Sequence, residues 1–248
     1  MQAQWRGRTV YLAFYAANAA LLPMLTLYYE SVGVSGARLG LLAALWPAGS
    51  IVGASLWGAV ADATGRHRLV LSGATLGAAA IAQLFFAGTG FFALLPIVTL
   101  FALVVAPVGP MLDNAVLMSL GKRQERFGRV RLWGAIGWGV AAPLAGLLMD
   151  ELGLTSVFPA FALLMMILFL SSRQLPVPAT SIGAGIYAGF AAIARSRQWR
   201  YFLLLVFAAG VGNAFVHHYL YIYINAIGGS GTMRGIALAV ATVSELVV

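Results

Sequence analysis

Cysteine is absent from this 248-residue chain, and charged residues make up only 9% of it. Without cysteine, the chain has no disulfide, no thiolate metal ligand and no cysteine nucleophile. The three histidines are His67, His217 and His218, and no carboxylate lies near them at the spacing of a zinc site. The apolar segments also lack a nucleophile–base pair, so we expect neither metal nor cofactor nor enzymatic activity.

Charged side chains are too few for a soluble protein. Hydrophobic residues make up 61% of the chain, whereas soluble domains have about half apolar and about a quarter charged residues. A domain of this length could not bury so much apolar surface in one core. We therefore expect the chain to lie in a lipid bilayer, where a helix of about 20 apolar residues satisfies its own backbone hydrogen bonds and crosses the membrane.

Seven apolar runs are long enough to cross a membrane, and an eighth begins near Met233 and continues to Val248. The seven runs are Val10–Tyr29, Arg38–Ala61, Leu69–Gly88, Phe91–Met118, Val130–Met149, Gly153–Ser172 and Arg200–Ile224. The predicted fold class is an all-α, polytopic membrane bundle. The longest connection predicts a six-helix bundle over residues 1–172, a cytoplasmic linker over 173–199, and the start of a second bundle over 200–248.

The basic residues gather on one side of these runs. Thirteen of the fifteen lie before the first run or in every second connection, and only Arg38 and Arg234 lie on the other side. The positive-inside rule then places the N-terminus in the cytoplasm. We expect the protein itself to lie in the inner membrane of a bacterial-type cell. Because topology explains the net charge of +8, we expect lipid and not nucleic acid as the partner.

A polar loop interrupts the apolar sequence between the second and third runs. Its candidate gating residues are Gly58, Asp62, Gly65, Arg66 and Arg68. Gly58 would let two helices approach closely, and Gly65 would permit a tight turn. Asp62 could pair with Arg66 or Arg68, or with the positive N-terminus of a neighbouring helix. The loop is therefore interpreted as a gate latch, with an ordinary positive-inside loop as the alternative.

The spacing of this loop resembles the signature of the major facilitator superfamily, Gly-xxx-Asp-xx-Gly-Arg followed by two basic residues, with His67 replacing one of them. The resemblance implies a twelve-helix transporter made of two six-helix halves. It implies that the chain is a C-terminally truncated member, with one complete half and part of the second, and a monomer when full-length.

Two acidic residues, Asp113 and Glu245, lie inside apolar runs. A charge within the membrane is costly unless it is paired or faces water, so each is a candidate functional residue, and Asn114 adjoins the first. The fourth and fifth runs are antiparallel, so Asp113 and Arg131 can lie at similar depth and pair. Trp138 lies two helical turns after Arg131, on the same helix face.

These residues resemble the substrate site of the lactose permease branch and the 3-phenylpropionic acid transporter type. That branch has an acid on helix four, an arginine on helix five and a tryptophan two turns later. Asp113 is shorter than the permease's glutamate, a departure that argues against sugar binding. Ser244-Glu245-Leu246 resembles the acid–leucine pair in which the branch has a proton-coupling glutamate.

The seventh run has Asn213, His217 and Tyr221 on one helix face. This face could contact an aromatic acid or relay protons, or it could be part of an interfacial aromatic belt.

The sequence thus predicts a proton-coupled symporter that moves a small organic solute by alternating access. An aromatic or organic acid is the first expectation, with Arg131 binding its carboxylate and protons as the coupling ion. A sugar or nucleoside symporter, a drug or metabolite exporter of the same superfamily, and a truncated remnant without transport stay open as alternatives.

We expect Glu245→Gln to abolish proton-driven uptake but to spare solute exchange, because glutamine resembles the protonated glutamate permanently. Uptake under an imposed pH gradient, compared with counterflow in the same vesicles, measures both. Unchanged proton-driven uptake would contradict a coupling role for Glu245.

Overall fold

The computed structural model describes residues 2–176 and 196–247, and leaves aside the side chains of residues 2, 3, 214–218 and 243–247. The described part of the chain is helical and contains no strand, so the predicted all-α fold class is confirmed. The helices are α1 (Gln2–Ser31), α2 (Gly36–Thr64), α3 (His67–Leu84), α4 (Phe91–Val105), α5 (Val108–Leu120), α6 (Phe127–Leu152), α7 (Val157–Ser172), α9 (Arg197–Ala226) and α10 (Gly231–Val247). Short 3-10 turns are η1 (Phe85–Ala87), η2 (Gly121–Arg126) and η3 (Leu154–Ser156).

Five helical stretches in the described residues are long and apolar enough to cross a membrane. They are Gln4–Ser31, Gly36–Thr64, His67–Ala87, Phe91–Leu152 and Leu154–Ser172. The fourth contains 62 residues, about three times the number that crosses a bilayer. It contains α4, α5 and α6 and reverses direction at η2.

The predicted run Phe91–Met118 is two helices in the structure. α4 ends at Val105 and α5 begins at Val108, with Pro107 at the break. Proline has no backbone N–H and its ring clashes with the carbonyl four residues earlier, so a continuous helix is disfavoured there. Pro110 lies in the first turn of α5, where the missing N–H is tolerated. The break sets the entry angle of α5, which carries Asp113.

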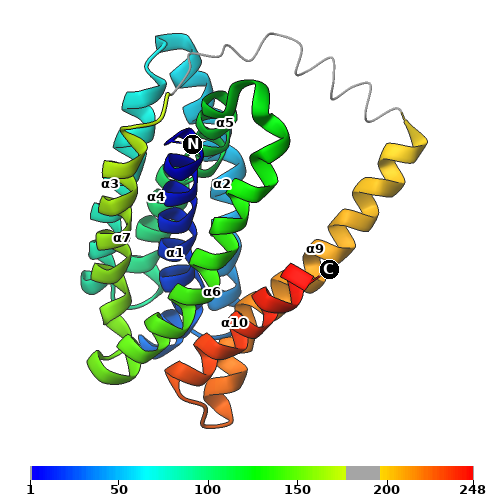
Figure 1. The fold of residues 1–248 in the computed structure, drawn as a ribbon. Helices are drawn as coiled ribbons and strands as arrows, with labels where there is room; N and C mark the ends of the chain where they lie inside the picture. The colour runs from blue at the N-terminus through cyan, green and yellow to red at the C-terminus, as the bar shows by residue number, and fades with distance from the viewer. Residues whose placement is uncertain (1, 177–195, 248) are drawn as a thin grey trace.

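α1 is the central helix of the bundle (Figure 1). In the apolar 18-residue stretch of each helix, 78% of the residues of α1 are buried, but only 17% of those of α2. It contacts α6 and α7 along its length and also contacts α5. At its far end, the hydroxyl of Tyr28 donates hydrogen bonds to the carbonyl oxygens of Phe85 (2.5 Å) and Gly88 (3.2 Å). α1 is therefore held both by packing and by a polar contact to the connection between α3 and α4.

Glycines let these helices cross at short distance. A Cβ atom on Gly137 of α6 would overlap the backbone of Leu12 in α1, and one on Gly134 would lie 2.5 Å from the ring of Tyr15. Between α2 and α4, a Cβ on Gly53 would lie 2.6 Å from the carbonyl oxygen of Leu103. In lipid, helix association depends on close van der Waals packing, and small residues permit it.

Gly58 does not have the role that the sequence predicted for it. A Cβ atom at this position would meet no atom of the described residues within 4 Å, so the expected close helix approach at Gly58 is wrong for this part of the chain. The close approach in α2 lies five and nine residues earlier, where Gly53 and Gly49 contact α4. The residue spacing of the loop signature cannot show which glycine of α2 faces a neighbour.

The two ends of the bundle differ in charge. We call the end with the start of α1, the α2–α3 turn and η2 the basic end, and the opposite end, with Glu30, Asp150 and Glu151, the acidic end. α9 begins at the basic end away from the bundle, and its side chains from Arg197 to Asn213 are exposed. α9 and the bundle come together at the acidic end, where α10 starts and returns along α6 (Figure 1).

We expect Gly53→Ala to lower the free energy of unfolding by about 1–3 kcal/mol, because the added methyl group overlaps backbone atoms of α4. Gly58→Ala is the matched control in the same helix. It should leave stability unchanged or raise it by about 1 kcal/mol, because alanine is the better helix former and the site is open. Thermal unfolding of both variants in detergent measures the difference, and equal melting temperatures would contradict the packing described here.

Candidate functional site

An ion pair lies where α1, α5 and α6 meet. Oδ2 of Asp113 in α5 is 3.7 Å from Nη1 of Arg131 in α6. The hydroxyl of Tyr11 donates a hydrogen bond of 2.5 Å to Oδ1 of Asp113. Nη2 of Arg131 donates a hydrogen bond of 3.4 Å to the hydroxyl of Tyr15. The structure therefore brings together the two charges that the sequence paired, and their role in binding stays a prediction.

The two tyrosines were missed in the sequence. Tyr11 and Tyr15 are four residues apart, so they share one face of α1, and this spacing was the available signal. It could not be used without knowing which helices face α1. Phe127, at the start of α6, adds an edge-on contact to the Tyr11 ring with centroids 6.2 Å apart. Aromatic rings therefore surround the charges on the α1 side.

The pair is balanced in charge and partly exposed. The side chain of Asp113 is 33% exposed and that of Arg131 is 50% exposed, so neither charge is fully enclosed by the helices. A carboxylate only accepts hydrogen bonds and a guanidinium only donates them. Together with the tyrosine hydroxyls, they offer donors and acceptors within one small region, with no net charge.

A cavity of about 400 Å³ adjoins Arg131. Tyr15, Arg131 and Trp138 line it from the bundle, and Leu238 and Thr242 line it from α10. It therefore lies between the segment before residue 173 and the segment after residue 196. The predicted alignment of Arg131 with Trp138 is present, since both side chains line this one cavity.

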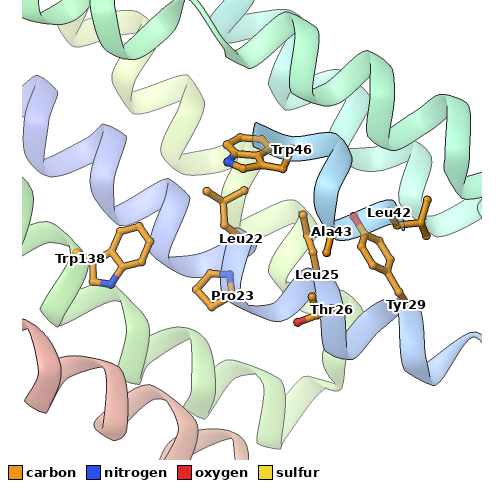
Figure 2. Close-up of a pocket in the computed structure, with 9 residues that line it drawn as sticks. All are labelled: Leu22, Pro23, Leu25, Thr26, Tyr29, Leu42, Ala43, Trp46 and Trp138. Carbon is orange, nitrogen blue, oxygen red and sulfur yellow. The ribbon is translucent and has the colours of Figure 1, made fainter. Parts of the chain in front are cut away.

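Trp138 also lines a second, more apolar cavity of about 170 Å³ between α1, α2 and α6. Figure 2 shows Trp138 on one side of Pro23 and Leu22, with Trp46 on the other side. Thr26 and Tyr29 bring the oxygen atoms among its lining residues. The indole of Trp138 thus lines both the cavity beside Arg131 and the more apolar cavity between α1, α2 and α6.

The other predicted site residues lie elsewhere. Asn114, next to Asp113 in sequence, lines a third cavity of about 100 Å³, shared with Gly58, Asp62 and His67 of the gating loop. The side chains of His217 and Glu245 lie outside the described residues, so both assignments stay predictions.

The gating loop forms the turn that the sequence predicted at Gly65, which ends α2 with φ +65°. Oδ1 of Asp62 lies 2.9 Å from Nε2 of His67, the first residue of α3, so the histidine that departs from the signature is a partner of the aspartate. Arg68 donates hydrogen bonds of 2.8 Å to the carbonyl oxygens of Arg173 and Leu175, which the sequence did not predict. Arg66 is exposed.

The loop therefore joins three helices at the basic end. Asp62 closes α2 onto α3, and Arg68 ties α3 to the segment that follows α7. Both contacts lie within the first 176 residues, so the latch seen here holds one bundle together.

A family model described as the MFS_1 like family matches residues 4–248. The chain belongs to this family of the major facilitator superfamily. It is therefore a multi-pass membrane protein of the superfamily that the loop signature indicated.

Two curated relatives align with 95% of this major facilitator chain. The maltose permease of Geobacillus stearothermophilus is 29% identical over 241 residues, and the uncharacterized transporter YwbF of Bacillus subtilis (strain 168) is 24% identical over 239 residues. The chain spans about 60% of the length of each relative.

Crystal structures of the nucleoside transporter NupG share the fold. A mutant form superimposes with a TM-score of 0.80 at 19% identity, covering 99% of this chain and 66% of NupG. A second NupG structure gives a TM-score of 0.77 at 18% identity, covering 100% of this chain and 66% of NupG. At this level of identity, the likeness shows the major facilitator fold and no more.

Proposed function

We propose that the protein is a proton-coupled symporter that moves a small, neutral, hydroxyl-rich solute by alternating access. The observation that carries this proposal is the charge-balanced pair of Asp113 and Arg131 beside a cavity lined by Trp138. A solute hydroxyl can donate to the carboxylate and accept from the guanidinium at the same time. A sugar ring can in addition lie against the indole, which supplies a large apolar face.

Charge balance is the reason to prefer a neutral solute. Asp113 already compensates the charge of Arg131 at 3.7 Å. An anionic solute would have to compete for Arg131 with this carboxylate, which is part of the protein and always nearby. The maltose permease among the relatives supports a sugar-like solute, and NupG, a nucleoside transporter, has the same fold. This proposal takes up the sugar and nucleoside alternative in place of the organic acid that the sequence favoured.

Proton coupling follows from the cost of charge in the membrane. When the solute draws Arg131 away, the carboxylate of Asp113 loses its counter-ion, and protonation removes the buried charge. A neutral, loaded carrier changes conformation at lower cost than one with an unpaired charge. Glu245 is the second candidate for this step, on the resemblance given above.

An organic acid is the second candidate solute. It would need protonated Asp113, which frees Arg131 to bind a carboxylate with two parallel hydrogen bonds. The half-exposed guanidinium and the neighbouring indole favour this arrangement.

The basic end is proposed to face the cytoplasm. The two N-terminal arginines, the α2–α3 turn and η2 all lie at this end, and positive residues are retained on the cytoplasmic side of inner-membrane proteins.

Solute-induced proton uptake by proteoliposomes tests the proposal. In weakly buffered suspension, we expect alkalinisation of the medium on addition of maltose or uridine, and none with 3-phenylpropionate. Arg131→Gln should lower the initial rate about tenfold or more, because it removes a charge-assisted donor. Arg129→Gln is the matched control, since Arg129 is an exposed arginine on the same helix and should leave the rate unchanged.

A response to 3-phenylpropionate alone would replace the neutral solute with the organic acid. A response to none of the three probes, or equal losses in the two arginine variants, would contradict the proposed site.

A further inference from the structure

Asp150, in the last turn of α6, makes three hydrogen bonds to the start of α10. Oδ1 accepts from the backbone N–H of Gly231 at 2.6 Å. Oδ2 accepts from the backbone N–H of Thr232 at 2.8 Å and from its hydroxyl at 2.7 Å. Both carboxylate oxygens are thus used by a helix that begins 81 residues later in the chain.

These contacts complete the cap of α10. The first four backbone N–H groups of a helix have no partner within it. Ser230 supplies the local cap, since its hydroxyl accepts from the N–H of Met233 at 3.1 Å. Asp150 takes the N–H groups of Gly231 and Thr232. A carboxylate is also favoured at this position by the positive end of the helix dipole. α10 therefore depends on a residue of the first bundle for its start.

Glycines bring the two helices close enough for this contact. A Cβ atom on Gly231 would lie 2.6 Å from the carbonyl oxygen of Gly146, and one on Gly235 would lie 2.5 Å from Cα of Pro143. Gly146 and Asp150 are one turn apart on α6, as are Gly231 and Gly235 on α10. The carboxylate and the glycine stripe therefore act on one continuous crossing.

A buried arginine extends the contact to α9. Arg234 is 7% exposed, and its Nη1 donates a hydrogen bond of 2.8 Å to Oδ1 of Asn225 near the end of α9. Its charge also interacts with that of Asp150. The acidic end thus joins α6, α9 and α10 through polar contacts.

The opposite end has the opposite arrangement. The side chains of α9 from Arg197 to Asn213 are exposed, and this part of α9 lies apart from the bundle at the basic end (Figure 1). The cavity lined by Arg131 and Trp138 lies between these two regions. The two segments are therefore closed at the acidic end and separate toward the basic end.

We propose that Asp150 is the closing residue of a gate at the acidic end: its carboxylate holds α10 against α6, and the gate opens when α10 leaves this cap. The inference rests on the alternating access of the proposed function. It adds a positioning residue that contacts neither solute nor coupling proton. The hydrogen bonds are made to backbone N–H groups, so their strength depends on the aspartate and not on the identity of the α10 side chains.

Distance measurements between spin labels test this gate without any solute. The chain has no cysteine, so Leu147→Cys on α6 and Ile236→Cys on α10, both about half exposed, provide labelling sites beside the crossing. The full chain with these two labels should show mainly the short distance. Asp150→Asn should raise the ratio of long to short distances at least fivefold, because the amide nitrogen cannot accept the bonds made by Oδ1 or Oδ2.

Glu151→Gln is the matched control, since it removes one negative charge at the neighbouring exposed position and should leave the ratio unchanged. Thr232→Val removes only the hydroxyl bond and should give a smaller rise. If Asp150→Asn does not yield folded, monodisperse protein, the distance ratio of Thr232→Val decides whether this contact holds the gate closed. An unchanged ratio in the folded Asp150 and Thr232 variants, or an equal rise with Glu151→Gln, would overturn the gate.

This result is separable from the proposed function. A changed distance ratio in Asp150→Asn, together with no solute-induced proton uptake in the parent protein, would support the gate and contradict the transport proposal. Normal proton uptake with an unchanged ratio would do the reverse.

Discussion

Close contact between helix backbones is the constraint on which this structure depends. In lipid, apolar side chains gain nothing by leaving the solvent, so helices associate through van der Waals packing and polar contacts. Gly134 and Gly137 let α6 reach α1, Gly53 lets α4 reach α2, and Gly146 lets α10 reach α6. These crossings decide which helix faces meet, and so bring Asp113 to Arg131 and Asp150 to α10.

Polar groups in this chain are used where two helices meet. Asp113 and Arg131 neutralise each other beside a cavity between the two segments. Asp150 caps α10 across the same boundary, at the acidic end. The first contact is partly exposed, and the second uses backbone groups that any helix start provides. The first contact lies within the first bundle, at a cavity that α10 also lines, and the second crosses from α6 to α10.

The sequence predicted the helices and the central pair but not the crossings. The length of an apolar run and the turn preference of a glycine depend only on local sequence. The all-α membrane fold and the turn at Gly65 could therefore be predicted. The pairing of Asp113 with Arg131 followed from antiparallel neighbours. Tyr11, Asp150 and the contact between Asp62 and His67 depend on which faces meet, and a single sequence does not contain that information. Gly58 is a further example, because the loop signature identified the glycine but could not show which helix, if any, lies next to it.

The distance between the two segments at the basic end tests alternating access most directly. Spin labels at Gln124 in η2 and Gln198 in α9, both exposed, report it in the cysteine-free chain. The account predicts a long distance without solute and a new, shorter distance when maltose is added at acidic pH, as the basic end closes. The distances are measured with and without maltose, each at acidic and at neutral pH. A distance distribution that stays the same under all four conditions would contradict the account.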